Sequence, residues 1–298
     1  GARRGRVLLL LCASLAAVES FVPQSPPPPP PHSLRSSPPS LQPPPSLRHP
    51  WFKMTRTAVQ AASGPGAVRG ILFDVDGTLC DSDPVHFEVF QELLMKEGIN
   101  GGKPIDEHFF RTMIAGRQNA LICKDLFPHW TVEQAERWSE MKEARFREMA
   151  VGKLKPIEGL QEIFHFLDQA GIKKAAVTNA PRKNAEFMLS VLGRLDWFDT
   201  IVIGDECKKA KPDPMPYQIA MERLGLKPEE TVVVEDSPSG ATAGVKSGAF
   251  TVGILTSQHA DTLTSVGCKM LIKDYRDAEF MTMIGSMNSE DIQSVLKA

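Results

Sequence analysis

The stretch that decides the fold is GILFDVDGTLCDSD, residues 70–83, in which a short apolar run leads directly into four carboxylates. The apolar run is typical of a buried strand, and the glycine at position 77 allows the backbone to turn after it. Asp74 and Asp76 follow the strand at once, so negative charge is concentrated at its exit. We expect a cation, a proton or both to be held there. From this stretch alone, an acidic polar loop without function remains the alternative.

Beyond Pro156 the chain alternates between short Val- and Ile-rich runs and helical patterns of about ten to fifteen residues. This alternation is typical of a parallel sheet that is covered by helices on both faces. In such sheets the binding crevice lies at the carboxyl ends of the strands. The runs are, in chain order, AAVT, IVI, TVVVE, FTVGIL and MLI.

The segment 85–155 shows helical patterns and no convincing strand. Pro84 opens the first helical pattern, which we expect to end at Gly98. Thr131 and Gln134 form a capping box that predicts a long polar helix to about Ala150. The predicted fold is therefore α/β, a Rossmann-like doubly wound parallel sheet core with an inserted all-helical cap domain. The predicted domains are a leader at 1–67, a core at 68–84 and 156–298, and a cap at 85–155.

The composition separates the N-terminal part from the rest of the chain. The sequence has 298 residues with 42% hydrophobic and 23% charged residues, which is typical of a globular protein. The first fifty residues hold five Arg, one Glu and no Lys or Asp, so the remainder carries a net charge of about −6. That charge is too acidic for a general nucleic-acid binder. The five cysteines contain no CxxC pair, which argues against a zinc site or a dense disulfide framework.

The N-terminal 67 residues have the features of a targeting leader. Arginines precede a twelve-residue apolar run at 7–18, which is typical of a signal peptide and too short to span a bilayer. The following tract, rich in Pro, Ser and Arg, resembles the transit-peptide half of the two-part leaders of plastid proteins. We expect plastid import and no stable membrane association after leader removal, with a secreted or cytoplasmic location as the alternatives. Six prolines at 26–31 predict a disordered linker, with an SH3-type ligand as the alternative.

Chemically active side chains follow each of the first four predicted strands. Taken singly, each has an ordinary explanation: a hydroxyl that caps a turn, a solvated lysine before a proline, or an acidic pair that starts a helix. Together they place carboxylates, a hydroxyl and a cation at one edge of a parallel sheet. They are, in chain order, Asp74 and Asp76, Thr178 and Asn179, Lys211, and Glu235 and Asp236.

With these motifs the sequence, over roughly residues 69–275, resembles a hydrolase of the haloacid dehalogenase superfamily with a helical cap inserted after the first motif. The segments LFDVDGTLCDSDPVHF, IAGRQN, AAVTNAP, KPDPMPY and VVVEDSPSG are similar to those of plant broad-range sugar-phosphate phosphatases and, less closely, of beta-phosphoglucomutases. The resemblance implies phosphoryl transfer through an aspartyl phosphate with Mg²⁺.

The resemblance also implies roles for the residues at the strand ends. Asp74 would be the nucleophile and Asp76 the acid and base that serves the leaving group and the attacking water. Thr178, the backbone N–H of Asn179, and Lys211 would hold the phosphate oxygens.

The same resemblance implies a magnesium site made of oxygen ligands. Asp74, the backbone carbonyl of Asp76 and the carboxylate of Asp236 would bind Mg²⁺. Glu235 would either join these ligands or orient them.

In the cap, the resemblance assigns four further residues to the substrate side of the site. His86 would face the leaving group or support Asp76, with a packing role at the hinge as an equal alternative. Gly116, Arg117 and Asn119 match the specificity loop, where Arg117 would reach a sugar hydroxyl or lie at the surface. Phosphoglucomutases of this type have an arginine where Asn119 stands, which argues against the mutase interpretation.

We therefore expect a Mg²⁺-dependent monomeric phosphatase that acts on small sugar phosphates and binds no nucleic acid. A sugar phosphomutase is the nearest alternative, and a non-catalytic scaffold with a proline-rich tail is the alternative outside enzymes.

Overall fold

The computed structural model describes residues 68–286. The predicted leader, its plastid-import interpretation and the proline run lie outside the described residues. Within this range no helix combines the length and the apolar character that a membrane crossing requires.

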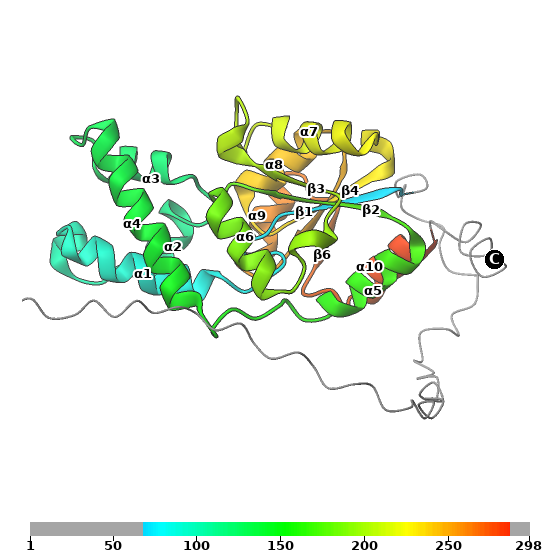
Figure 1. The fold of residues 1–298 in the computed structure, drawn as a ribbon, viewed down its shortest axis with the longest axis horizontal. Helices are drawn as coiled ribbons and strands as arrows, with labels where there is room; N and C mark the ends of the chain where they lie inside the picture. The colour runs from blue at the N-terminus through cyan, green and yellow to red at the C-terminus, as the bar shows by residue number, and fades with distance from the viewer. Residues whose placement is uncertain (1–67, 287–298) are drawn as a thin grey trace, which may run out of the picture. The chain divides into compact units, whose positions relative to one another are not determined.

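Six strands form one parallel sheet in the order β3-β2-β1-β4-β5-β6 (Figure 1). Strand β1 lies inside the sheet, where Leu72 pairs with Ala175 of β2 and Val233 of β4. The predicted α/β class with a parallel sheet is confirmed. The strands are β1 (Gly70–Phe73), β2 (Lys173–Thr178), β3 (Thr200–Ile203), β4 (Thr231–Glu235), β5 (Phe250–Ile254) and β6 (Met270–Ile272).

Helices cover both faces of the sheet, because alternate strand residues are apolar on each face. Ile71 and Phe73 of β1 belong to one buried cluster, and Leu72 between them belongs to the other. The first cluster includes α5 (Leu160–Ala170), α6 (Arg182–Val191) and α10 (Ala278–Ser286), and the second includes α7 (Met215–Leu224) and α8 (Pro238–Lys246). Figure 1 shows α7 and α8 above the sheet and α5 and α10 below it.

Three helices of this core were not predicted from the sequence. Helix α5 has buried residues at 160, 163, 164 and 167, a spacing that identifies an amphipathic helix. Helices α9 (Ala260–Ser265) and α10 have six and nine residues, so each offers fewer than three turns in which a helical spacing can be recognised. Helix α9 packs against α8, β5 and β6 at the edge of the sheet.

The described residues between 83 and 150 form helices and no strand. Trp138 lies at the centre of their apolar interior, with its ring centroid 6.0 Å from that of Phe90 and 5.6 Å from that of Phe127. The division into cap and core at residues 85 and 155 stays a prediction. The helices are α1 (Asp83–Lys96), α2 (Glu107–Met113), α3 (Asn119–Leu126) and α4 (Val132–Ala150).

The predicted capping box of α4 is confirmed. Thr131 Oγ1 accepts a hydrogen bond from the Gln134 backbone N–H at 3.3 Å, and Gln134 Oε1 accepts one from the Thr131 N–H at 2.9 Å. Both bonds satisfy backbone donors that a helix start otherwise leaves unpaired. This cap fixes the first turn of α4, the helix that also contains Lys142 and Glu143.

We expect Thr131→Ala to lower the free energy of unfolding by about 1 kcal/mol, because the first turn of α4 loses its side-chain acceptor. Urea unfolding followed by circular dichroism measures the change. Thr112→Ala is the matched control, because the Thr112 hydroxyl is exposed and donates to a carbonyl within α2. Equal stability of the Thr131 variant and the wild type would contradict the capping role.

Candidate active site

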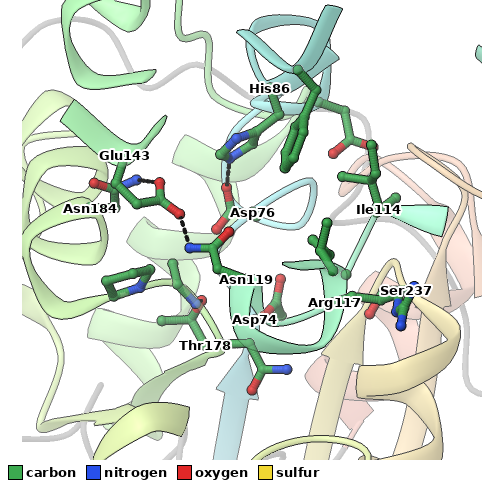
Figure 2. A pocket seen from close by; sticks show the side chains of 18 of the residues that line it. Asp74, Asp76, His86, Ile114, Arg117, Asn119, Glu143, Thr178, Asn184 and Ser237 are labelled. Carbon is green, nitrogen blue, oxygen red and sulfur yellow. Dashed lines mark hydrogen bonds and ion pairs between the residues drawn. The ribbon is translucent and has the colours of Figure 1, made fainter. Parts of the chain in front are cut away.

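The ends of strands β1, β2 and β4 meet at one pocket. Asp74 directly follows β1, Thr178 is the last residue of β2, and Asp236 directly follows β4. Lys211 reaches the same place from the loop after β3. Helices α1 to α4 supply the opposite wall of the pocket (Figure 2). The predicted residues that line it are Asp74, Asp76, His86, Gly116, Arg117, Asn119, Thr178, Asn179, Lys211 and Asp236.

The ammonium group of Lys211 connects three strand ends. Its Nζ donates to Asp74 Oδ1, to the Val177 carbonyl and to Glu235 Oε1, each at 2.6 Å. An ammonium has three donors, so all of them are used. Burial alone would lower the pKa of Lys211, but the charges of Asp74 and Glu235 raise it above its usual value. Lys211 is therefore a buried cation that fixes the orientation of Asp74.

Three buried carboxylates form a group that could hold a metal ion. One carboxylate oxygen from each of Asp74, Glu235 and Asp236 lies within 4.8 Å of the others. Burial raises the pKa of Asp74 to about 8 against the opposing charge of Lys211. Burial and the charge of Asp74 also raise the pKa of Asp236 well above its usual value. Burial and mutual repulsion make it costly for these neighbouring carboxylates to ionise. A divalent cation that prefers oxygen ligands would offset this cost, so the group fits such an ion.

Hydrogen bonds from neighbouring residues hold the carboxylate of Asp236 in place. Ser257 Oγ donates to Oδ2 at 2.5 Å and Thr78 Oγ1 donates to Oδ1 at 3.3 Å. Gly77 forms the predicted turn beside it with φ at 68°, and a side chain at this position would overlap the Asp236 carboxylate. Ser257 and Thr78 were not predicted from the sequence, because only the fold brings them to Asp236.

The carboxylate of Asp76 points to a different set of partners. Its Oδ1 accepts from Ser82 Oγ at 2.8 Å and lies 2.9 Å from His86 Nε2. The His86 ring stacks on Phe146, with 3.9 Å between the ring centroids. Burial would raise the pKa of Asp76, but the hydrogen bonds from His86 and Ser82 hold it below its usual value. His86 therefore contacts Asp76 directly, and the Asp76 side chain lies outside the three-carboxylate group.

Thr178 and Asn179 present polar atoms to the pocket at the end of β2. The Thr178 hydroxyl accepts from the Ala180 backbone N–H at 3.0 Å, which leaves its own proton available to a ligand. Asn179 Nδ2 donates to the Lys211 carbonyl at 3.3 Å, and its Oδ1 is buried without a hydrogen-bond partner among the described residues.

The predicted loop residues of the helical segment meet the core at the pocket. A side chain on Gly116, whose φ is 71°, would come within 2.5 Å of Ser237 Cβ. Arg117 Nη2 donates to Asp125 at 2.5 Å and Nη1 donates to the Met113 carbonyl at 2.7 Å. Asn119 Nδ2 donates to Glu143 Oε1 at 2.5 Å.

Several residues of the site were not assigned to it from the sequence. Tyr217 is fully buried, and its hydroxyl donates to Glu235 Oε1 at 2.6 Å. It is the last residue of the segment KPDPMPY, which begins with Lys211, so its closeness to Lys211 in the sequence could have indicated a place in the site. Lys142, Glu143 and Asn184 also line the pocket, but nothing in the polar pattern of α4 distinguishes Lys142 and Glu143 from exposed charges.

Comparison with known proteins identifies relatives over most of the described chain. Residues 71–254 match the family described as haloacid dehalogenase-like hydrolase. The chain is 32% identical over 219 residues to a phosphorylated carbohydrates phosphatase from Thermotoga maritima, covering 69% of this chain and 94% of the relative. It is 28% identical over 209 residues to a validoxylamine A 7'-phosphate phosphatase from Streptomyces hygroscopicus subsp. limoneus, covering 70% and 95%.

A solved beta-phosphoglucomutase from Clostridium difficile has the same fold. Its TM-score is 0.63 at 21% identity, and the match covers 76% of this chain and 99% of that chain. At this identity the likeness shows the fold alone.

We expect Gly240→Ala to lower the free energy of unfolding by about 1–3 kcal/mol, because the added methyl group would overlap the buried Glu235 carboxylate. Gly285→Ala is the matched control, because it makes the same change in a helix where no atom lies within 4 Å. Urea unfolding of both variants measures the difference. A Gly240 variant as stable as the Gly285 variant would show that Glu235 is not held as described.

Proposed function

Because the chain belongs to the haloacid dehalogenase-like hydrolase family, we propose that it is a Mg²⁺-dependent phosphatase that hydrolyses small sugar phosphates through an aspartyl phosphate at Asp74. The observation that carries the proposal is the buried group of Asp74, Lys211 and Asp236, which line one pocket, together with Glu235 beneath them. The names of the two phosphatase relatives support phosphorylated carbohydrates as the substrate class.

In the first half of the reaction, Asp74 is the nucleophile. One of its oxygens is held by Lys211, so the carboxylate keeps a fixed orientation in the pocket. Its free oxygen attacks phosphorus, the bond between phosphorus and the sugar oxygen breaks, and an acyl phosphate forms on Asp74. Thr178 and the backbone N–H of Asn179 hold the phosphate oxygens during this step, and the charge of Lys211, whose three donors bond to Asp74, Val177 and Glu235, offsets their negative charge.

Asp76 moves the protons in both halves of the reaction. Protonated Asp76 donates to the sugar oxygen as it leaves, and the resulting carboxylate then takes a proton from the water that attacks the acyl phosphate. His86 and Ser82 favour the ionised form of Asp76, which suits its second role as a base. Free phosphate leaves and the Asp74 carboxylate is restored.

Asp74 and Asp236 are the carboxylates that would bind Mg²⁺, with the backbone carbonyl of Asp76 as a further oxygen ligand. Bound Mg²⁺ supplies positive charge that offsets the repulsion between the phosphate and these carboxylates. Glu235 has its Oε1 occupied by Lys211 and Tyr217, so we assign it to the orientation of Lys211.

We expect the wild-type protein with Mg²⁺ to release free phosphate from hexose and pentose phosphates. Asp74→Asn should lower this rate by at least about 1,000-fold, because the amide is a poor nucleophile. Asp261→Asn, which removes an exposed carboxylate, is the control and should act as the wild type does. Phosphate release and sugar products are measured together.

Three results of this assay would contradict the proposal. Isomerised sugar phosphate without net phosphate release would show a phosphomutase. Equal activity of the wild type and the Asp74 variant would exclude the assigned nucleophile. No hydrolysis of any ester by the wild type would favour a non-catalytic scaffold.

We expect Ser257→Ala to raise the Mg²⁺ concentration for half-maximal activity about 10- to 100-fold, because Asp236 loses a hydrogen bond that orients it. Ser265→Ala is the control, since its exposed hydroxyl donates only to the Thr262 carbonyl. Magnesium titrations after treatment with EDTA measure the effect. An unchanged magnesium requirement in the Ser257 variant would contradict the role of this hydrogen bond in orienting Asp236 for the metal.

A further inference from the structure

A buried ion pair of the helical segment faces the pocket. Lys142 and Glu143 of α4 are 4% and 6% exposed, and Lys142 Nζ donates to Glu143 Oε1 at 2.8 Å. Asn119 donates to the same Glu143 oxygen, and Asn184 of α6 donates to the other one. Figure 2 shows Glu143 between these two amides on the wall of the pocket. The mechanism above uses none of these four side chains.

Each cation that lines the pocket in the described part of the chain is paired with a carboxylate. Lys211 bonds to Asp74, and Arg117 bonds to Asp125. Lys142 is paired with Glu143, which makes this part of the wall neutral. A phosphate group needs unpaired donors or positive charge for tight binding. The wall formed by the helical segment therefore offers little to a second phosphate beyond the one at Asp74.

Glu143 keeps one acceptor site for a ligand. A carboxylate can accept about four hydrogen bonds, and three are already used. Burial would raise the pKa of Glu143, but the charges of Lys142 and His86 hold it below its usual value. Glu143 is therefore ionised, so it can accept a hydrogen bond from a hydroxyl group and it cancels the Lys142 charge that would otherwise attract a further anion.

We propose that Glu143 selects the substrate by charge, so that the site takes monophosphates of uncharged polyols and excludes bisphosphates. This inference rests on the proposed phosphatase function and adds the specificity of the pocket. The buried position of the pair is what makes the selection effective, because charges inside a protein are screened much less than charges at the surface.

Arg117 is the rival candidate for a second phosphate. Its pair with Asp125 is partly exposed, at 26% and 45%, and such pairs contribute little to stability. If Arg117 left Asp125 to bind a second phosphate, bisphosphates would be good substrates of the wild type. Arg117→Gln would then remove that activity.

The test compares kcat/KM for the hexose monophosphate that the wild type hydrolyses best with kcat/KM for the 1,6-bisphosphate of the same hexose. We expect the wild type to prefer the monophosphate at least about tenfold. Glu143→Gln frees the charge of Lys142 and should raise the ratio of bisphosphate to monophosphate activity at least about tenfold. Lys142→Met should lower this ratio, and the double variant should return it towards that of the wild type.

Glu140→Gln is the matched control, because it removes an exposed carboxylate from the same helix and should leave the ratio unchanged.

A wild type that hydrolyses both esters equally well would overturn the inference and leave the phosphatase function standing. This comparison uses the wild type alone, so it does not depend on the folding of a variant. A Glu143 variant with lower activity on both esters and an unchanged ratio would also overturn it, since that result indicates a structural role. No hydrolysis of any monophosphate would instead refute the proposed function itself.

Discussion

The hydrogen bonds of the Lys211 ammonium are the interaction on which the site depends. They join the ends of β1, β2 and β4 at a point where the carboxylates of Asp74 and Glu235 would otherwise repel each other. Removing one partner of a buried ion pair costs about 3–5 kcal/mol of stability. Loss of the Lys211 charge would therefore destabilise the folded protein. The same contact that neutralises buried charge also sets the direction of the Asp74 carboxylate. The stability of this region and the orientation of the proposed nucleophile thus both depend on Lys211.

The parallel sheet explains why such a group can form. All strand ends of one polarity meet at one edge, so residues that are 137 and 24 positions apart in the chain from Lys211 reach its ammonium. The helical segment then closes the pocket with side chains of its own, and among the ion pairs of its described residues the Lys142–Glu143 pair is the most deeply buried. The core therefore supplies the reacting groups, and in our proposal the helical segment decides which esters reach them.

The sequence was sufficient to locate the site residues that lie directly at the end of a strand. Asp74, Thr178 and Asp236 could be placed because each lies at the end of a short apolar run. Ser257 and Asn184 could not be placed, because their partners are distant in the chain and only the folded structure joins them. Glu143 was hidden for another reason. In a polar helix a buried charge has the same pattern as an exposed one.

Trapping the covalent intermediate tests the central claim most directly. The wild-type enzyme is mixed with Mg²⁺ and a sugar phosphate, quenched in acid within the first turnovers, digested and analysed by mass spectrometry. We predict one added phosphoryl group on the peptide that contains Asp74, and its absence from the Asp74→Asn variant. Phosphate release from the wild type with no phosphorylated peptide, or with the phosphoryl group on another residue, would contradict the account.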